Sequence, residues 1–264
     1  MRNRKFVKTF FIFLLIGFIG ILSYVPSLIP SLKKQLETVP NAPDLPLSVL
    51  VPLSLINPFI LVIIAIVIGM LTAPKVELKS YIYDWIHHQK TGQNTTSFKS
   101  NIGLGVISGV ILAMFFVGLE ILLQPYLPDV FKLTPEARNL SMTFGGIFYG
   151  GITEELMLRW GMMSFIVWSF WKLFQRSQPR PSSAIYWVSI ILSALLFAVG
   201  HYGATAMAAP VTTILWIRMM ILNGLGAIVF GWLFWKKGLE ISFISHASLH
   251  IASTIFVQVW FLIF

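Results

Sequence analysis

Seven apolar stretches, each long enough to cross a lipid bilayer, dominate this sequence. They cover residues 10–32, 47–73, 102–123, 142–174, 184–208, 211–235 and 241–264. A membrane-spanning helix needs about 20 apolar residues, and only helices or closed barrels satisfy their backbone hydrogen bonds inside lipid. The sequence therefore predicts an all-α fold, a polytopic transmembrane helical bundle with about seven (six to eight) spanning helices.

The composition excludes an ordinary soluble domain. Hydrophobic residues make up 56% of the chain and charged residues only 11%, whereas soluble domains contain about 25% charged residues. The absence of cysteine excludes disulfides, thiol catalysis and cysteine-ligated metal sites. No internal repeat of the kind found in many transporters is present. We expect a single membrane domain over residues 1–264.

The excess of positive charge is explained by orientation in the membrane. The chain has a formal net charge of +9. Apart from Arg159 and Arg218, thirteen Lys and Arg residues lie on one side of the predicted bilayer and four on the other. The positive-inside rule places the N-terminus in the cytoplasm and, with seven spans, the C-terminus outside. The first stretch lacks a small-residue cleavage site, so we interpret it as an uncleaved span rather than a signal peptide. We expect an integral multi-pass protein of the plasma (inner) membrane and no nucleic-acid partner.

Ionisable residues inside the apolar stretches are the candidate functional residues. A charge at the centre of a membrane helix costs roughly 2.5–3.5 kcal/mol, so such residues must pair, face water or become neutral. The set comprises Glu120, Glu154, Glu155, Arg159, Arg218, His201, His246 and His250.

The fourth stretch holds the densest group of these charges. Glu155 and Arg159 are four residues apart with the acid first, which favours a structural ion pair on one helix face. Glu154 points about 100° away from Glu155 and has no helical cation partner, which makes it a candidate general base. Gly146 and Gly150 have the small-xxx-small spacing that lets a second helix approach closely.

Histidines on two later stretches could share a site with Glu154. Phe197 and His201 lie on one helix face, and His246 and His250, also four residues apart, lie on another. Taken alone, His201 could simply bond a backbone carbonyl. The pair of His246 and His250 could be a metal pair, a proton relay or a polar helix contact.

Together these motifs resemble the CAAX-prenyl-protease and bacteriocin-processing (Abi, CPBP) family of intramembrane proteases. That family has the ordered motifs EExxxR, FxxxH and HxxxN or HxxxD. Here they read Glu154-Glu155 with Arg159, Phe197 with His201, and His246 with His250. The resemblance covers about residues 142–253, so we expect a CAAX-protease-like catalytic core in residues 142–264 and N-terminal helices of low resemblance in residues 1–141. His250 departs from the family pattern, which has Asn or Asp at that position.

The resemblance implies an intramembrane endopeptidase without a covalent intermediate. Its substrates would be membrane-associated or prenylated-like proteins or peptides. Glu154, assisted by His201, would activate a water, and His246 and His250 would stabilise the oxyanion. No cofactor is implied. The orienting residues would be Glu155, Arg159 and Phe197.

Three alternatives stay open at this point. The first is a zinc-dependent protease, because Glu154, His201, His246 and His250 are chemically suitable zinc ligands. The second is a non-proteolytic immunity or scaffold protein on the same fold, which the departure at His250 favours. The third is a proton-coupled transporter, since intramembrane Glu and His residues also form proton relays. The sequence makes no prediction of the oligomeric state.

Overall fold

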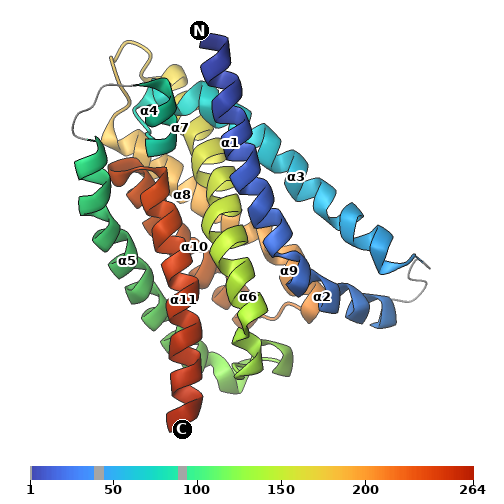
Figure 1. The fold of residues 1–264 in the computed structure, drawn as a ribbon. Helices are drawn as coiled ribbons and strands as arrows, with labels where there is room; N and C mark the ends of the chain where they lie inside the picture. Colours follow the sequence, from blue (N-terminus) through green and yellow to red (C-terminus); the bar gives the residue numbers. More distant parts are fainter. Residues whose placement is uncertain (1, 39–44, 89–93) are drawn as a thin grey trace.

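All regular structure in the part of the chain that is described is helical. The computed structural model describes residues 2–38, 45–88 and 94–264, and within these ranges there is no strand. Figure 1 shows the long helices side by side, with the two termini at opposite ends of the molecule. The all-α prediction is therefore confirmed.

Six helices in the described ranges are long and apolar enough to cross a membrane, which lies within the predicted range of six to eight. The chain is thus an integral multi-pass membrane protein. The six are α1 (Arg2–Ser23), α3 (Leu47–Thr72), α5 (Asn94–Leu123), α8 (Ser183–Gly200) with α9 (Tyr202–Ala208), α10 (Thr213–Lys237) and α11 (Leu239–Ile263).

The fourth apolar stretch is helical but is not one regular α-helix. It begins with α6 (Leu140–Gly145), continues as two π-helical segments, η5 (Gly146–Glu154) and η6 (Leu156–Met163), and ends with α7 (Ser164–Phe174). A π-helix bonds residue i to i+5 and is frequent at functional sites. This composite helix runs through the middle of the bundle, with η5 against α1 and α11 and η6 against α3.

Two other predicted stretches contain a break. Residues 10–32 are divided at Tyr24 between α1 and α2 (Val25–Thr38). Pro26 explains this break, because proline lacks an N–H and disfavours a helical residue before it. Residues 184–208 are divided at His201, between α8 and α9.

Short helices connect the long ones at the two ends of the bundle. At the end where the chain begins, η1 (Ala73–Val76) and α4 (Tyr81–His87) follow α3. The buried Glu240 carboxylate accepts the backbone N–H groups of Tyr81 at 2.9 Å and Ile82 at 3.0 Å, which ties α4 to α11. At the opposite end, η2 (Gln124–Tyr126), η3 (Asp129–Phe131) and η4 (Glu136–Arg138) connect α5 to α6.

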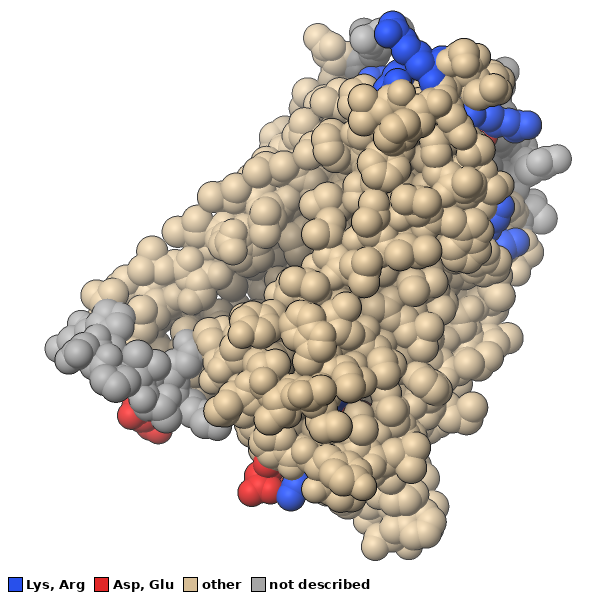
Figure 2. Space-filling view, turned by 180° about the vertical axis from the view of Figure 1, so that it is seen from behind, with Lys and Arg blue, Asp and Glu red and all other residues tan. Residues whose placement is uncertain are grey.

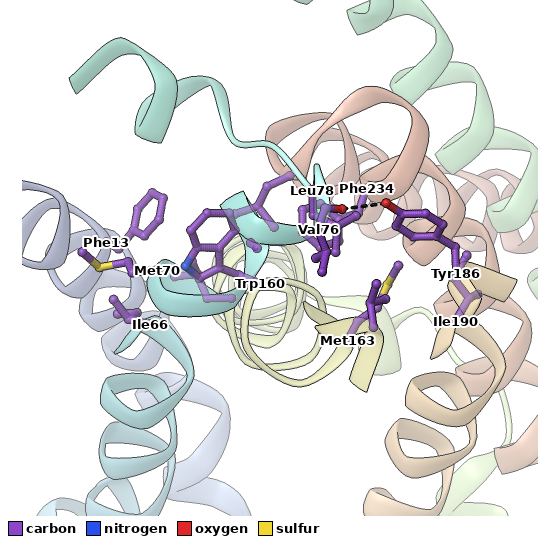
Figure 3. Close-up of a cluster of buried hydrophobic side chains, with 14 of the residues drawn as sticks. Phe13, Ile66, Met70, Val76, Leu78, Trp160, Met163, Tyr186, Ile190 and Phe234 are labelled. Carbon is purple, nitrogen blue, oxygen red and sulfur yellow. Dashed lines mark hydrogen bonds between the residues drawn. The ribbon is translucent and has the colours of Figure 1, made fainter. Parts of the chain in front are cut away.

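A buried hydrophobic cluster fixes η6 in the bundle (Figure 3). The fully buried Trp160 ring lies 5.4 Å from the Phe13 ring and 6.4 Å from the Phe234 ring, measured between centroids. A Cβ atom on Gly69 would lie only 2.3 Å from the Trp160 ring, so α3 can pack here only with glycine at that position. The second half of the composite helix is therefore anchored in the core, and its first half, η5, is left to face a cavity.

The distribution of charge fits a protein surrounded by lipid. Figure 2 shows Lys and Arg side chains gathered at one end of the molecule and a broad surface almost without charge between the two ends. The basic end includes Lys5 and Lys8 near the start of α1 and Lys236 and Lys237 at the end of α10. Lys90, which the charge count includes, lies outside the described residues. The cytoplasmic location of this end stays a prediction.

Candidate active site

A cavity of about 430 Å³ lies between η5 and the helices α5, α8, α9, α10 and α11. All four candidate catalytic residues line it, namely Glu154, His201, His246 and His250. They come from three segments that are far apart in the sequence. The structure thus brings the acid and the three histidines to one place.

Glu155 is the centre of a buried polar cluster beside this cavity. Its side chain is 0% exposed. The expected ion pair is present, with Arg159 Nε 3.2 Å from Glu155 Oε2. The other oxygen, Oε1, accepts a hydrogen bond of 2.9 Å from His246 Nδ1, and the Ser242 hydroxyl donates to Oε2. Glu155 therefore does more than neutralise Arg159, because it also holds a candidate catalytic histidine.

Two aromatic rings enclose the guanidinium of Arg159. The side chain is 1% exposed, and its Cζ atom lies 5.3 Å from the centroid of the Phe197 ring and 5.6 Å from that of the Phe230 ring. A cation over the face of an aromatic ring is attracted by the ring quadrupole. Phe197 thus helps to fix the cation that pairs with Glu155.

Phe197 also positions His201. The Phe197 carbonyl accepts a hydrogen bond of 2.9 Å from His201 Nδ1, and the two rings meet edge to face with centroids 4.6 Å apart. Because a carbonyl can only accept, Nδ1 carries the proton. In the neutral ring Nε2 is then an acceptor.

His246 is fixed in the same way by Glu155. Its ring stacks between Phe230, at 4.4 Å, and His250, at 5.1 Å, measured between centroids. With Nδ1 donating to the carboxylate, Nε2 is the free nitrogen of the ring. A Cβ atom on Gly150 would lie 3.3 Å from this Nε2, so a side chain on η5 would crowd it.

His250 packs directly on the glycines of η5. A Cβ atom on Gly146 would lie 2.5 Å from His250 Cγ, and one on Gly150 would lie 2.9 Å from His250 Nε2. The close helix approach expected at these two glycines is present. Neither ring nitrogen of His250 has a hydrogen-bond partner among residues 2–38, 45–88 and 94–264, so either tautomer is available.

Glu154 is the acid of the site without a partner. Its side chain is partly exposed to the cavity, and within the described ranges no hydrogen bond or ion pair engages its carboxylate. The stacked rings of Tyr24 and Tyr149, with centroids 5.1 Å apart, line the same cavity. The two neighbouring acids therefore differ, with Glu155 fully engaged and Glu154 free.

Two arginines, Arg218 and Arg138, also line the cavity. Arg218 of α10 donates from Nε to Glu120 Oε2 of α5 at 2.8 Å and from Nη2 to Oε1, and it lies over the Phe131 ring. Arg138 of η4 lines the cavity as well. As charges inside apolar stretches, Glu120 and Arg218 were each expected to need a partner. That they pair with each other could not be predicted, because they are 98 positions apart in the sequence. In the sequence, Arg138 is only one of the four basic residues on the less basic side of the predicted bilayer.

The candidate zinc ligands are not grouped as a metal site in the part of the chain that the structure describes. In the described ranges no three His, Asp or Glu side chains are grouped so that they could hold a metal ion. The zinc alternative therefore lacks a ligand cluster in the described ranges.

Comparison with known proteins gives one family match. Residues 136–252 match the family described as type II CAAX prenyl endopeptidase Rce1-like. This range runs from η4 into α11 and includes every residue of the three motifs. Searches of curated proteins and of solved structures found no match.

Proposed function

We propose that this chain, whose residues 136–252 belong to the Rce1-like family of CAAX endopeptidases, is an intramembrane endopeptidase that uses a water activated by Glu154. Its substrates would be membrane-associated proteins or peptides. The observation that carries the proposal is the unpartnered Glu154 carboxylate, which shares one cavity with three histidines while Glu155 is fully engaged. Residues 142–264 would supply the catalytic core, and helices of residues 1–141 would enclose it.

In the first step, Glu154 takes a proton from a water as the water oxygen attacks the scissile carbonyl carbon. The geometry of His201 supports an assisting role, because its Nδ1–H is occupied by the Phe197 carbonyl. Its free Nε2 can accept the second hydrogen of the same water. Glu154 then returns its proton to the amine that leaves, so the carboxylate is regenerated.

The tetrahedral intermediate carries an oxyanion that needs donors. His250 can supply an N–H in either neutral tautomer. His246 can donate from Nε2 only as the imidazolium, since Nδ1 already donates to Glu155. The buried carboxylate of Glu155 stabilises that cation, which assigns Glu155 a positioning role behind His246.

The test is cleavage of a panel of lipid-anchored peptides in liposomes that contain the purified protein, with products identified by mass spectrometry. We expect Glu154→Gln to lower the cleavage rate by about 10²–10⁴-fold, the usual contribution of a general base. Because Glu154 has no partner, the variant should fold normally. The matched control is Glu77→Gln, since Glu77 is an exposed acid outside the cavity whose ion pair with Arg180 spans 4.0 Å.

The same experiment tests the non-proteolytic alternative, which His250 in place of Asn or Asp favours. A scaffold protein would bind panel peptides without cutting any of them. Cleavage by Glu154→Gln at the wild-type rate would overturn the assignment of the base.

A further inference from the structure

Arg138 is a cation of the cavity without an anion. It belongs to η4, its side chain is partly buried, and it lines the cavity. Among residues 2–38, 45–88 and 94–264, no carboxylate lies within the 4.0 Å ion-pair distance of its guanidinium. Lys132 of the same connection differs, because it pairs at the surface with Asp129 at 2.7 Å.

The nearby carboxylate cannot serve as this missing anion. Glu120 already accepts two hydrogen bonds from Arg218. This is the forked geometry that matches one guanidinium to one carboxylate. Burial lowers the pKa of Arg138 from its usual value, and the charge of Glu120 only opposes this shift. A partly buried guanidinium that keeps its charge requires an anion or water.

Arg138 and the proposed base reach the cavity from different segments. Arg138 is the last residue of η4, just before α6, and Glu154 is the last residue of η5. The cavity therefore has an acid without a partner on η5 and a cation without a partner on η4.

We infer that Arg138 binds a carboxylate of the peptide substrate and so acts as a specificity residue of this cavity. The inference rests on the proposed function. A peptide lying across the cavity would present its scissile carbonyl to Glu154 and its carboxylate to Arg138. The carboxylate is either the C-terminal group of the substrate or the side chain of an Asp or Glu, and both would form the same forked pair with a guanidinium.

The test uses a panel peptide that the wild-type protein cleaves, synthesised in matched forms. One pair differs only in a C-terminal carboxylate or amide, and a second pair has Asp and Glu replaced by Asn and Gln. We expect the form that lacks the recognised carboxylate to show KM raised about 10- to 100-fold with kcat nearly unchanged, as expected for a lost charge-assisted hydrogen bond. The affected pair identifies the source of the carboxylate.

Variants of the protein must then remove this discrimination. Arg138→Gln should cleave both members of the affected pair with the same high KM, and Arg138→Lys should keep part of the difference, because an ammonium retains the charge without the fork. Lys132→Gln is the control and should discriminate as the wild type does. Binding of fluorescent forms of the same peptides to the Glu154→Gln variant measures the same difference without turnover.

The outcomes separate this inference from the proposed function. Cleavage that does not depend on any peptide carboxylate would overturn the role of Arg138 and leave the protease intact. Cleavage could instead depend on phosphatidylglycerol in the liposomes and not on any carboxylate of the peptide. That result would show that Arg138 binds lipid phosphate and would also overturn its role in substrate specificity. Absence of cleavage of every peptide would overturn the protease, and the binding measurement would still decide the role of Arg138.

Discussion

Replacement of Glu155 by Gln tests the polar cluster most directly. The substitution keeps the shape of the side chain but removes the charge that faces Arg159 Nε at 3.2 Å and His246 Nδ1 at 2.9 Å. Because Arg159 is 1% exposed, it would become an unpaired buried cation. Removing one partner of a buried ion pair typically costs about 3–5 kcal/mol. We expect Glu155→Gln to lower the thermal midpoint of the protein in detergent and to lose activity.

A double variant separates the two roles of Glu155. Arg159→Met removes the cation at similar volume, so Glu155→Gln combined with Arg159→Met leaves no unpaired charge and should recover most of the stability. It should not recover activity, because His246 still lacks its carboxylate. A hydrogen bond to a charged group contributes about 2 kcal/mol, which corresponds to a rate about thirtyfold lower.

The assay compares thermal midpoints by size-exclusion chromatography after heating, and cleavage rates in liposomes at equal amounts of folded protein. A single variant as stable as the wild type would refute the buried pair as a stabilising contact. A double variant that is folded and fully active would refute the positioning of His246 by Glu155.

Three further predictions concern the rest of the cavity. His250→Asn should retain much of the activity because an amide N–H also donates a hydrogen bond. His250→Ala should lose about 3 kcal/mol of transition-state stabilisation, or roughly a hundredfold in single-turnover rate; equal losses in the two variants would contradict the donor role. Because the described His, Asp and Glu side chains form no group able to hold a metal ion, activity should survive chelation and elemental analysis should find less than one zinc per chain; activity that is lost on chelation and restored by zinc would overturn the glutamate mechanism. Gly146→Ala should reduce activity, since its Cβ would lie 2.5 Å from His250 Cγ, whereas the control Gly118→Ala has no neighbour within 4 Å and should remain active; equal rates would refute the packing argument.

Features that depend on local spacing could be predicted from the sequence. The length of the apolar stretches predicted the all-α membrane bundle, and the four-residue spacing predicted the Glu155–Arg159 pair. The break at Tyr24 also had a local signal, in Pro26. Each of these depends on residues that are neighbours along one helix.

Features that depend on tertiary packing could not be predicted. The hydrogen bond from His246 to Glu155 joins residues 91 positions apart, and the fork of Arg218 on Glu120 joins residues 98 positions apart. The positions expected along the fourth stretch depend on α-helical spacing, whereas η5 and η6 are π-helical. A π-helix turns by a different angle per residue. Arg138 lines the cavity although it belongs to the connection between α5 and α6, and no periodicity in the sequence reports such a position.

The position of the cavity along the bundle has a consequence for how a substrate would be oriented across the membrane. Phe131, Leu133 and Arg138, which line the cavity, belong to the connection at the end of the molecule opposite the N-terminus (Figure 1). If the basic end faces the cytoplasm, as the charge distribution predicts, that connection would lie on the far side of the membrane. A substrate held as proposed, with its carboxylate at Arg138, would then have that carboxylate directed toward the far side of the membrane.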